Sequence, residues 1–72
     1  MIKCHLSKLM GAKRLKISEF SEQTGINRGT ITRLYHEQAE RVELDVLNKV
    51  CHYLDCELGE LFEYIPDEID KN

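Results

Sequence analysis

The chain has 72 residues, of which 42% are hydrophobic and 32% charged, and a formal net charge of −3. This length allows a single domain with a thin core, because a chain of this size buries only about 60% of its unfolded surface. The composition excludes a disordered tail, and no apolar run approaches the roughly 20 residues that span a bilayer. Since Lys3, Lys8 and Lys13 interrupt the start, we expect no signal peptide and a soluble cytoplasmic protein without a membrane partner.

The first predicted element is a helix that covers Lys3 to about Lys13. Its apolar residues recur at the spacing of one helix face and are expected to point toward the core. They are Ile2, Leu6, Leu9 and Met10.

Two short helices are predicted next, within residues 16–35, KISEFSEQTGINRGTITRLY. The apolar and small residues of the first of them share one face: Ile17, Phe20, Ser21 and Thr24. Because Ser21 is small, a second helix can approach closely there. Gly25 is suited to the positive φ that ends a helix, and Ile26 can fill the angle between the two helices. This arrangement predicts a helix-turn-helix.

The helix after the turn is expected to have an inner and an outer face. Asn27 is a good N-cap, because its side-chain oxygen can accept a hydrogen bond from a free N–H of the new helix. Ile31, Leu34 and Tyr35 point toward the core. The residues that project outward or from the leading end are Arg28, Gly29, Thr32, Arg33 and His36. This outer set is polar and compact enough to reach the edges of bases.

Two further helices complete the predicted fold. The polar segment 36–42 is expected to be the loop that leaves the outer helix. A fourth helix then carries an apolar stripe typical of an ordinary core, formed by Leu44, Leu47, Val50, Cys51 and Leu54. A short fifth helix is predicted from Leu58 to Tyr64, and Pro66 closes it. The last residues, 67–72, are expected to be frayed.

The segment GINRGTITRL resembles the helix-turn-helix of bacterial and phage repressors of the Cro/CI type (XRE-like), and also the headpiece pattern of the lactose repressor. VELDVLNKVCHYLDCELGELFEY resembles the fourth and fifth helices of the Cro/CI-type domain, so the resemblance covers about Lys3 to Tyr64. It implies an all-α fold, a compact five-helix bundle of the lambda-repressor-like DNA-binding type over residues 1–66. It also implies a transcriptional regulator, expected to be a repressor, that binds double-stranded DNA sequence-specifically.

The charge is divided unevenly along the chain. Residues 1–33 hold seven basic and two acidic side chains, a net charge of +5, whereas residues 34–72 hold three basic and eleven acidic ones, a net charge of −8. Binding of a polyanion depends on the local patch, and the positive half contains the outer helix of the motif. A basic run alone is more often a solvated surface, but its coincidence with the motif favours DNA.

The side chains of the outer helix differ in what they can contact. Arg28 and Arg33 are the predicted base contacts, because a guanidinium can donate two hydrogen bonds to O6 and N7 of guanine. Phosphate contacts are expected from Thr30, Thr32 and Lys16, and from the N–H groups near Asn27.

Two positions of the predicted interface have two explanations each. A glycine early in a helix costs about 1 kcal/mol relative to alanine. Gly29 therefore either lets the backbone approach a base or a thymine methyl, or it marks a tolerant position. His36 lies one turn beyond Arg33 on the exposed face, where it either touches a phosphate or a base edge or is simply solvated.

The three cysteines do not predict a metal site. Cys51 and Cys56 form a single Cys-x4-Cys pair, whereas structural zinc usually requires two closely spaced pairs. Cys51 lies on the apolar stripe, and an odd number of cysteines in a chain without a leader favours reduced thiols. We therefore expect no metal and no cofactor.

The sequence shows no glycine-rich phosphate loop and no nucleophile paired with a base, so we do not expect an enzyme. Because one reading helix covers few base pairs, we expect a homodimer that binds two half-sites about one helical turn apart. Phe62, Tyr64 and Ile65 are the predicted dimer contacts, and no pocket for a small-molecule effector is evident. The alternative is a protein-interaction module, such as an antitoxin-like or regulatory subunit, that docks a partner through its acidic second half.

Overall fold

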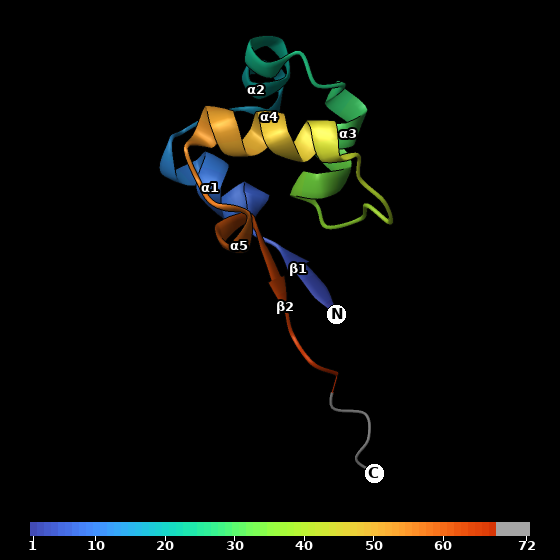
Figure 1. Ribbon diagram of the computed structural model, residues 1–72. Helices are drawn as coiled ribbons and strands as arrows, with labels where there is room; N and C mark the ends of the chain where they lie inside the picture. Colours follow the sequence, from blue (N-terminus) through green and yellow to red (C-terminus); the bar gives the residue numbers. More distant parts are fainter. Residues whose placement is uncertain (68–72) are drawn as a thin grey trace.

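A computed structural model describes residues 1–67 of the chain, and within them five short helices accompany a two-stranded antiparallel sheet. In chain order the elements are β1 (Ile2–Cys4), α1 (Leu6–Ala12), α2 (Ile17–Thr24), α3 (Arg28–Tyr35), α4 (Leu44–Leu54), α5 (Leu58–Leu61) and β2 (Phe62–Tyr64). Figure 1 shows α2 and α3 at one end of the molecule and the sheet extending from the other. Within residues 1–67, no helix combines the length and the hydropathy needed to cross a bilayer.

The core takes residues from every helix. The side chains that are at most 7% exposed are Cys4, Leu6, Met10, Phe20, Ile26, Ile31, Leu34, Val50, Leu54 and Leu61. The ring of Phe20 also meets the ring of Tyr53 of α4 edge to face, with 5.4 Å between centroids. Burial of each large apolar side chain contributes roughly 1.5–3 kcal/mol. The core therefore packs α2 and α3 against α1 and α4. The inward positions predicted for Phe20, Ile31 and Leu34 are confirmed.

The predicted first helix is wrong at its start. Residues 2–4 form β1, which pairs with β2 in the register Ile2 with Tyr64, Lys3 with Glu63 and Cys4 with Phe62. Ile2, expected to face the core, is 62% exposed. The residues Ile2, Lys3 and Cys4 alternate in polarity as in a strand, but the pattern is too short to be distinguished from the end of a helix without its distant partner.

The predicted fifth helix is wrong beyond Leu61, and the fold is not strictly all-α. The helix α5 has four residues, Leu58–Leu61, and the chain continues directly as β2. The N–H of Glu57 donates to the carboxylate of Glu60 at 2.7 Å, which satisfies a backbone donor at the start of this single turn. Pairing with β1 then replaces further helical turns, because two strands of opposite direction satisfy each other's backbone groups.

The fourth helix has the predicted bounds, but its apolar stripe begins later than predicted. Leu44 is the first residue of α4 and is 80% exposed, so its assignment to the core is wrong. Val50 and Leu54 are buried, and Val46 is half-buried against the core. The first residue of this helix lies outside the region that packs against the core. Helical spacing alone does not show where along a helix that region begins.

Three helices end at a non-glycine residue with positive φ: Arg14 after α1 (55°), Glu37 after α3 (58°) and Asp55 after α4 (53°). In each case the N–H of the next residue bonds to the carbonyl five residues earlier, the pattern of the Schellman C-cap. These caps produce the short connections of the domain. The predicted frayed tail, 67–72, lies outside the described residues except for Asp67.

Candidate nucleic-acid interface

Side-chain hydrogen bonds fix the turn between α2 and α3. Gly25 ends α2 with a φ of +78°, a conformation that glycine adopts without strain. The hydroxyl of Ser21 donates to the carbonyl of Ile26 at 2.7 Å, and the hydroxyl of Thr24 accepts from the Ile26 N–H at 3.2 Å. The Ile26 side chain is 4% exposed, as expected for a residue that fills the angle between the helices. The turn thereby sets the direction of α3 relative to α2.

The predicted N-cap of α3 is confirmed. Oδ1 of Asn27 accepts from the N–H of Gly29 at 2.8 Å and from the N–H of Thr30 at 3.3 Å. Two backbone donors of the first turn are therefore already satisfied within the protein. Asn27 consequently presents its amide nitrogen, rather than its oxygen, to a ligand.

Four of the predicted site residues lie on the outer side of α3 and at its C-cap. Gly29, Arg33 and His36 follow one another at i, i+4 and i+7, the spacing of a single helix face, with Thr32 beside them. Arg33 and His36 are exposed, and the His36 ring packs edge to face against Tyr35. The side opposite this stripe carries Ile31 and Leu34, which are buried. The structure therefore separates the outer and inner faces as the sequence predicts.

The other predicted residues lie around the start of the two motif helices. Arg28 is exposed at the first position of α3. Lys16 is exposed at the N-cap of α2, where its own N–H donates to the carboxylate of Glu19 at 3.1 Å. Lys16 therefore belongs to a different element from the stripe, and its ammonium group is held by a flexible side chain.

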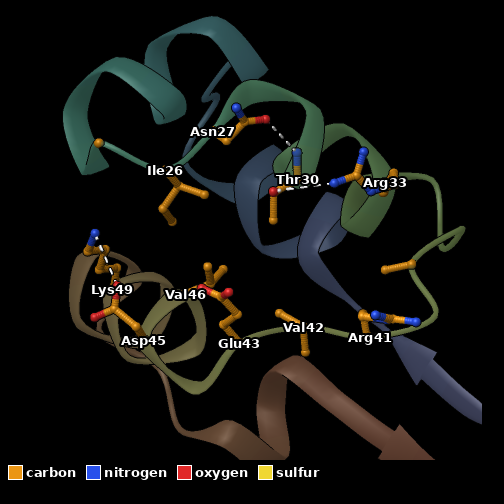
Figure 2. A pocket seen from close by; sticks show the side chains of 12 residues that line it. Ile26, Asn27, Thr30, Arg33, Arg41, Val42, Glu43, Asp45, Val46 and Lys49 are labelled. Carbon is orange, nitrogen blue, oxygen red and sulfur yellow. Dashed lines mark hydrogen bonds and ion pairs between the residues drawn. The ribbon is translucent and has the colours of Figure 1, made fainter.

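The Arg33 side chain runs back toward the start of α3. Its Nη2 lies 3.5 Å from the hydroxyl oxygen of Thr30, and its Nη1 is 3.4 Å from where a Cβ on Gly29 would stand. Figure 2 shows Arg33 and Thr30 linked in this way, with Asn27 at the adjacent helix start. The guanidinium thus lies along the helix, where a Cβ on Gly29 would make only an ordinary van der Waals contact with it.

The two threonines of α3 are not equivalent. The Thr32 hydroxyl donates to the carbonyl of Arg28 at 2.9 Å, so it would have to give up this bond in order to donate to a phosphate. The Thr30 hydroxyl accepts from Arg33, which leaves its hydrogen free to donate. Thr30 is therefore the better placed of the two for a phosphate contact.

A hollow of about 370 Å³ opens beside α3, between the turn, the segment 39–43 and the start of α4. Figure 2 shows Thr30 and Arg33 on one side of it and Glu43, Asp45 and Lys49 on the other. Lys49 pairs with Asp45 at 3.3 Å. Asp45 and Lys49 are not among the residues that the sequence predicts for this site. Their i, i+4 spacing indicates a pair on a helix, but only the packing of α4 brings them near α3.

One glutamate after α3 is turned away from this surface. Glu37 accepts a hydrogen bond from the backbone N–H of Cys4 at 3.2 Å and another from the Lys3 ammonium at 3.4 Å. The Cys4 N–H, and to a lesser extent Lys3, hold the pKa of the Glu37 carboxyl below its usual value. Glu37 therefore joins the loop after α3 to β1, and its charge is directed to the sheet rather than to the outer face of α3.

The three cysteines have free thiols. Cys4 is buried, and burial raises the pKa of its thiol. Within the described part of the chain, no three His, Cys, Asp or Glu side chains are grouped so that they could hold a metal ion.

The fold and the sequence are similar to those of known DNA-binding domains. Residues 5–67 match the model of the Cro/C1-type HTH DNA-binding domain. The chain is 28% identical to the uncharacterized HTH-type transcriptional regulator YozG of Bacillus subtilis (strain 168), over 83% of this chain and 71% of that protein.

Two solved structures share the fold. The transcriptional regulator VanUg superposes with a TM-score of 0.73 at 30% identity, over 92% of this chain and 87% of that one. A candidate DNA-binding protein from Bacteroides fragilis superposes with a TM-score of 0.74 at 24% identity, over 88% of this chain and all of the other. The resemblance read from the motif is confirmed, and the chain belongs to the family of Cro/C1-type HTH DNA-binding domains.

Proposed function

We propose that the chain regulates transcription, as a repressor, by placing α3 in the major groove of a specific duplex DNA site. The observation that carries this proposal is the exposed Arg33 side chain on the outer face of α3, opposite the buried Ile31 and Leu34, with its guanidinium 3.5 Å from the Thr30 hydroxyl. The major groove is about 12 Å wide and admits one α-helix. The proposed activity is binding without catalysis, in the cytoplasm, where it would meet its DNA.

The proposed roles follow from the donors that each residue offers. Arg33 and Arg28 donate to base edges, and each bidentate contact with guanine is worth roughly 1–3 kcal/mol of discrimination. Gly29 lets the start of α3 approach the floor of the groove, and His36 extends the stripe by one turn. The proposed phosphate contacts are Thr30, Thr32, Lys16 and the amide of Asn27.

Selection of bound sequences from a random DNA pool tests this proposal. We expect one enriched site, and an affinity whose logarithm falls linearly with the logarithm of the salt concentration. Arg33→Ala should weaken binding to that site by about 5- to 150-fold, equivalent to the 1–3 kcal/mol of one base contact, and flatten the preference at one base position. Lys8→Ala is the matched control, because it removes one exposed basic charge from α1.

The same experiment separates the two functions considered above. Lys8→Ala should leave the selected sequence unchanged and alter the affinity only slightly. No enriched sequence, together with a flat salt dependence, would contradict DNA reading. That result would instead favour an interaction module that docks a partner through acidic residues such as Glu40 and Glu43.

We propose that the DNA-binding unit is a homodimer in which a second copy covers the sheet. The cross-strand pair Ile2 and Tyr64 is 62% and 68% exposed, whereas the next pair on the same face, Cys4 and Phe62, is buried or half-buried. The apolar face of the sheet thus continues beyond the part that the helices cover. An apolar groove of about 380 Å³ adjoins it, lined by Ile2, Leu34, Ala39, Glu40, Arg41, Val42, Leu47 and Phe62. In a two-fold dimer, the exposed side chains of Ile2 and Tyr64 of one copy would pack into this groove of the other copy. Such a surface is self-complementary, as a two-fold interface requires.

Sedimentation equilibrium at tens of micromolar tests the homodimer. We expect a dimer for the unchanged chain and a monomer for Tyr64→Glu, because the substitution places a charge in the buried centre of the proposed interface. Leu44→Glu is the control, since Leu44 is also an exposed apolar residue but lies on α4. A monomeric unchanged chain, or a Tyr64→Glu variant that remains dimeric, would refute this interface.

A further inference from the structure

Cys51 and Cys56 occupy the two facing positions of the C-cap that ends α4. Asp55 has a φ of 53°, its N–H donates to the carbonyl of His52 at 3.3 Å, and the N–H of Cys56 donates to the carbonyl of Cys51 at 3.1 Å. This is the Schellman arrangement, in which the side chains of the first and last residues of the turn face each other. At the end of α4 those two residues are Cys51 and Cys56.

The corresponding positions at the end of α1 hold an apolar pair. There Arg14 has a φ of 55°, and the N–H of Leu15 donates to the carbonyl of Met10 at 2.9 Å. Met10 and Leu15 are the facing pair, and both are apolar residues of the core or its edge. After α4 the same geometry holds two half-buried free thiols. An apolar pair would therefore satisfy the packing here, so packing alone does not explain why both residues are cysteines.

The backbone holds the two cysteines within disulfide range. With 3.1 Å between the Cys56 nitrogen and the Cys51 oxygen, the bond lengths of the peptide unit allow the two Cα atoms to be at most about 7 Å apart. Disulfides usually join Cα atoms about 4.4–6.8 Å apart. We propose that Cys51 and Cys56 are a site of oxidative modification, at which a reversible intramolecular disulfide forms without unfolding the domain.

The oxidant in this proposal is a low-molecular-weight disulfide such as oxidised glutathione. The thiolate of one cysteine attacks a sulfur of the oxidant, which forms a mixed disulfide and releases one glutathione thiol. The thiolate of the other cysteine then attacks the protein sulfur of the mixed disulfide, which forms the Cys51–Cys56 bond and releases the second glutathione thiol. The pair loses two electrons and two protons, which convert the oxidised glutathione into two molecules of its thiol.

The surroundings of Cys56 make this reaction slow at neutral pH. Burial, followed by the neighbouring Cys51, Glu60 and Asp55, raises the pKa of the Cys56 thiol to about 11. Since the thiolate is the reactive form, exchange should accelerate as the pH rises. The pair therefore responds to the sustained redox state of its surroundings, and it is not built as a rapid peroxide sensor.

The new bond should stabilise the domain and leave DNA reading intact. It would close a short ring at a place where the backbone is already hydrogen-bonded, so α2 and α3 need not move. It would also tie α4 to the segment that continues through α5 into β2. A ring this short should raise the melting temperature of so small a domain by about 9–18 °C.

The test treats the full chain with oxidised glutathione, blocks the remaining thiols by alkylation and maps tryptic peptides by mass. Cleavage after Lys49 and Lys71 leaves Cys51 and Cys56 in one peptide, whereas Cys4 falls in another. We expect the first peptide to lose two hydrogens and to escape alkylation, and the Cys4 peptide to be alkylated. The oxidised chain should melt higher than the reduced chain, and dithiothreitol should restore the original melting temperature.

Variants show whether the pair itself is responsible. Cys4→Ser should oxidise and gain thermal stability like the unchanged chain. Cys51→Ser should yield a glutathione mixed disulfide on Cys56 and no gain. The proposal is overturned if the unchanged chain yields only mixed disulfides or disulfides between chains, or if the oxidised chain melts at or below the temperature of the reduced one.

Discussion

The guanidinium of Arg33 lies against Gly29, with Nη1 3.4 Å from the point that a Cβ would occupy. The same Cβ would stand 3.0 Å from Oδ1 of Asn27, the atom that caps the helix. A side chain at position 29 would therefore crowd the cap, whereas its contact with the arginine would be an ordinary one. This intramolecular reason adds to the two explanations that the sequence left open, namely close approach to DNA and simple tolerance.

Gly29→Ala should separate stability from DNA binding. The added Cβ forces Asn27 to shift and weakens a cap worth about 1 kcal/mol, while alanine regains about 1 kcal/mol of helix propensity. We expect the free energy of unfolding to change by less than about 1 kcal/mol. DNA affinity should fall at least about fivefold, because the added Cβ keeps the start of α3 from the close approach to the groove floor proposed for Gly29. Urea denaturation and DNA titration measure the two effects.

Asn27→Ala is the control for that experiment. It removes the cap without adding an atom beside Arg33, so it should lower the free energy of unfolding by about 0.5–2 kcal/mol. Equal losses of DNA affinity in Gly29→Ala and Asn27→Ala would show that Gly29→Ala acts only through Asn27, as the cap or as the proposed phosphate contact, and not through the approach of α3 to the groove floor.

Two glycines of the chain should respond to alanine in opposite directions. Neither Gly11 nor Gly25 has a neighbouring atom within 4 Å of an added Cβ, but Gly25 has a φ of +78°. Gly25→Ala should lower the free energy of unfolding by about 1–2 kcal/mol because of left-handed strain. Gly11→Ala should raise it by about 0.4–1 kcal/mol, since α1 gains a better helix former. Thermal melts of the two variants provide the comparison, and a loss of stability in both would contradict it.

Glu37→Gln should change how stability depends on pH. Because the pKa of Glu37 is lowered in the folded protein, the unfolded chain binds more protons as the pH falls, so acidification favours unfolding. The contribution of Glu37 is fully present above its ordinary value of 4.5 and disappears as the pH falls through the lowered pKa. The variant should be less stable than the unchanged chain at pH near 7, and the difference should shrink in acid.

Urea denaturation at a series of pH values measures this effect. Glu22→Gln, at an exposed position of α2, serves as the matched loss of one carboxylate. A stability difference for Glu37→Gln that stays constant down to strong acid would contradict the role assigned to the bonds with Cys4 and Lys3.

Arg14→Gly should stabilise the end of α1. Arg14 adopts a φ of 55°, and a side chain in this conformation costs about 1–2 kcal/mol, part of which glycine recovers. Glu37→Gly removes the same strain at a φ of 58° but also removes the bonds to Cys4 and Lys3. We therefore expect a higher melting temperature for Arg14→Gly than for the unchanged chain, and a lower one for Glu37→Gly. A lower melting temperature for both would mean that the side chain of Arg14 has a contact of its own.

Local signals were sufficient to predict the helix-turn-helix. Helical spacing identified Phe20 and Ile31 as inward, and residue chemistry identified Gly25 as the left-handed end of α2 and Asn27 as the cap of α3. Each of these inferences depends on residues within two turns of one another. That is the range over which spacing and capping rules apply.

What the sequence did not reveal depends on contacts between distant segments. The strand 2–4 forms because it pairs with residues 62–64. The sequence near Ile2 does not indicate which distant segment is its partner. The contact of Glu37 with Cys4 and the approach of Lys49 to α3 likewise require the assembled core. The proximity of Arg33 to Gly29 depends on a side-chain rotamer, which spacing along a helix does not specify.

The pairing of β1 with β2 has a consequence for synthesis on the ribosome. The first strand emerges before all five helices, whereas β2, the partner that satisfies its backbone, emerges after them. Until then the backbone N–H and C=O groups of Ile2 and its neighbours are unpaired and can bond to other chains. The helix-turn-helix, which relies on local contacts, can form before β2 has been synthesised, whereas closure of the sheet must wait until β2 has left the ribosome.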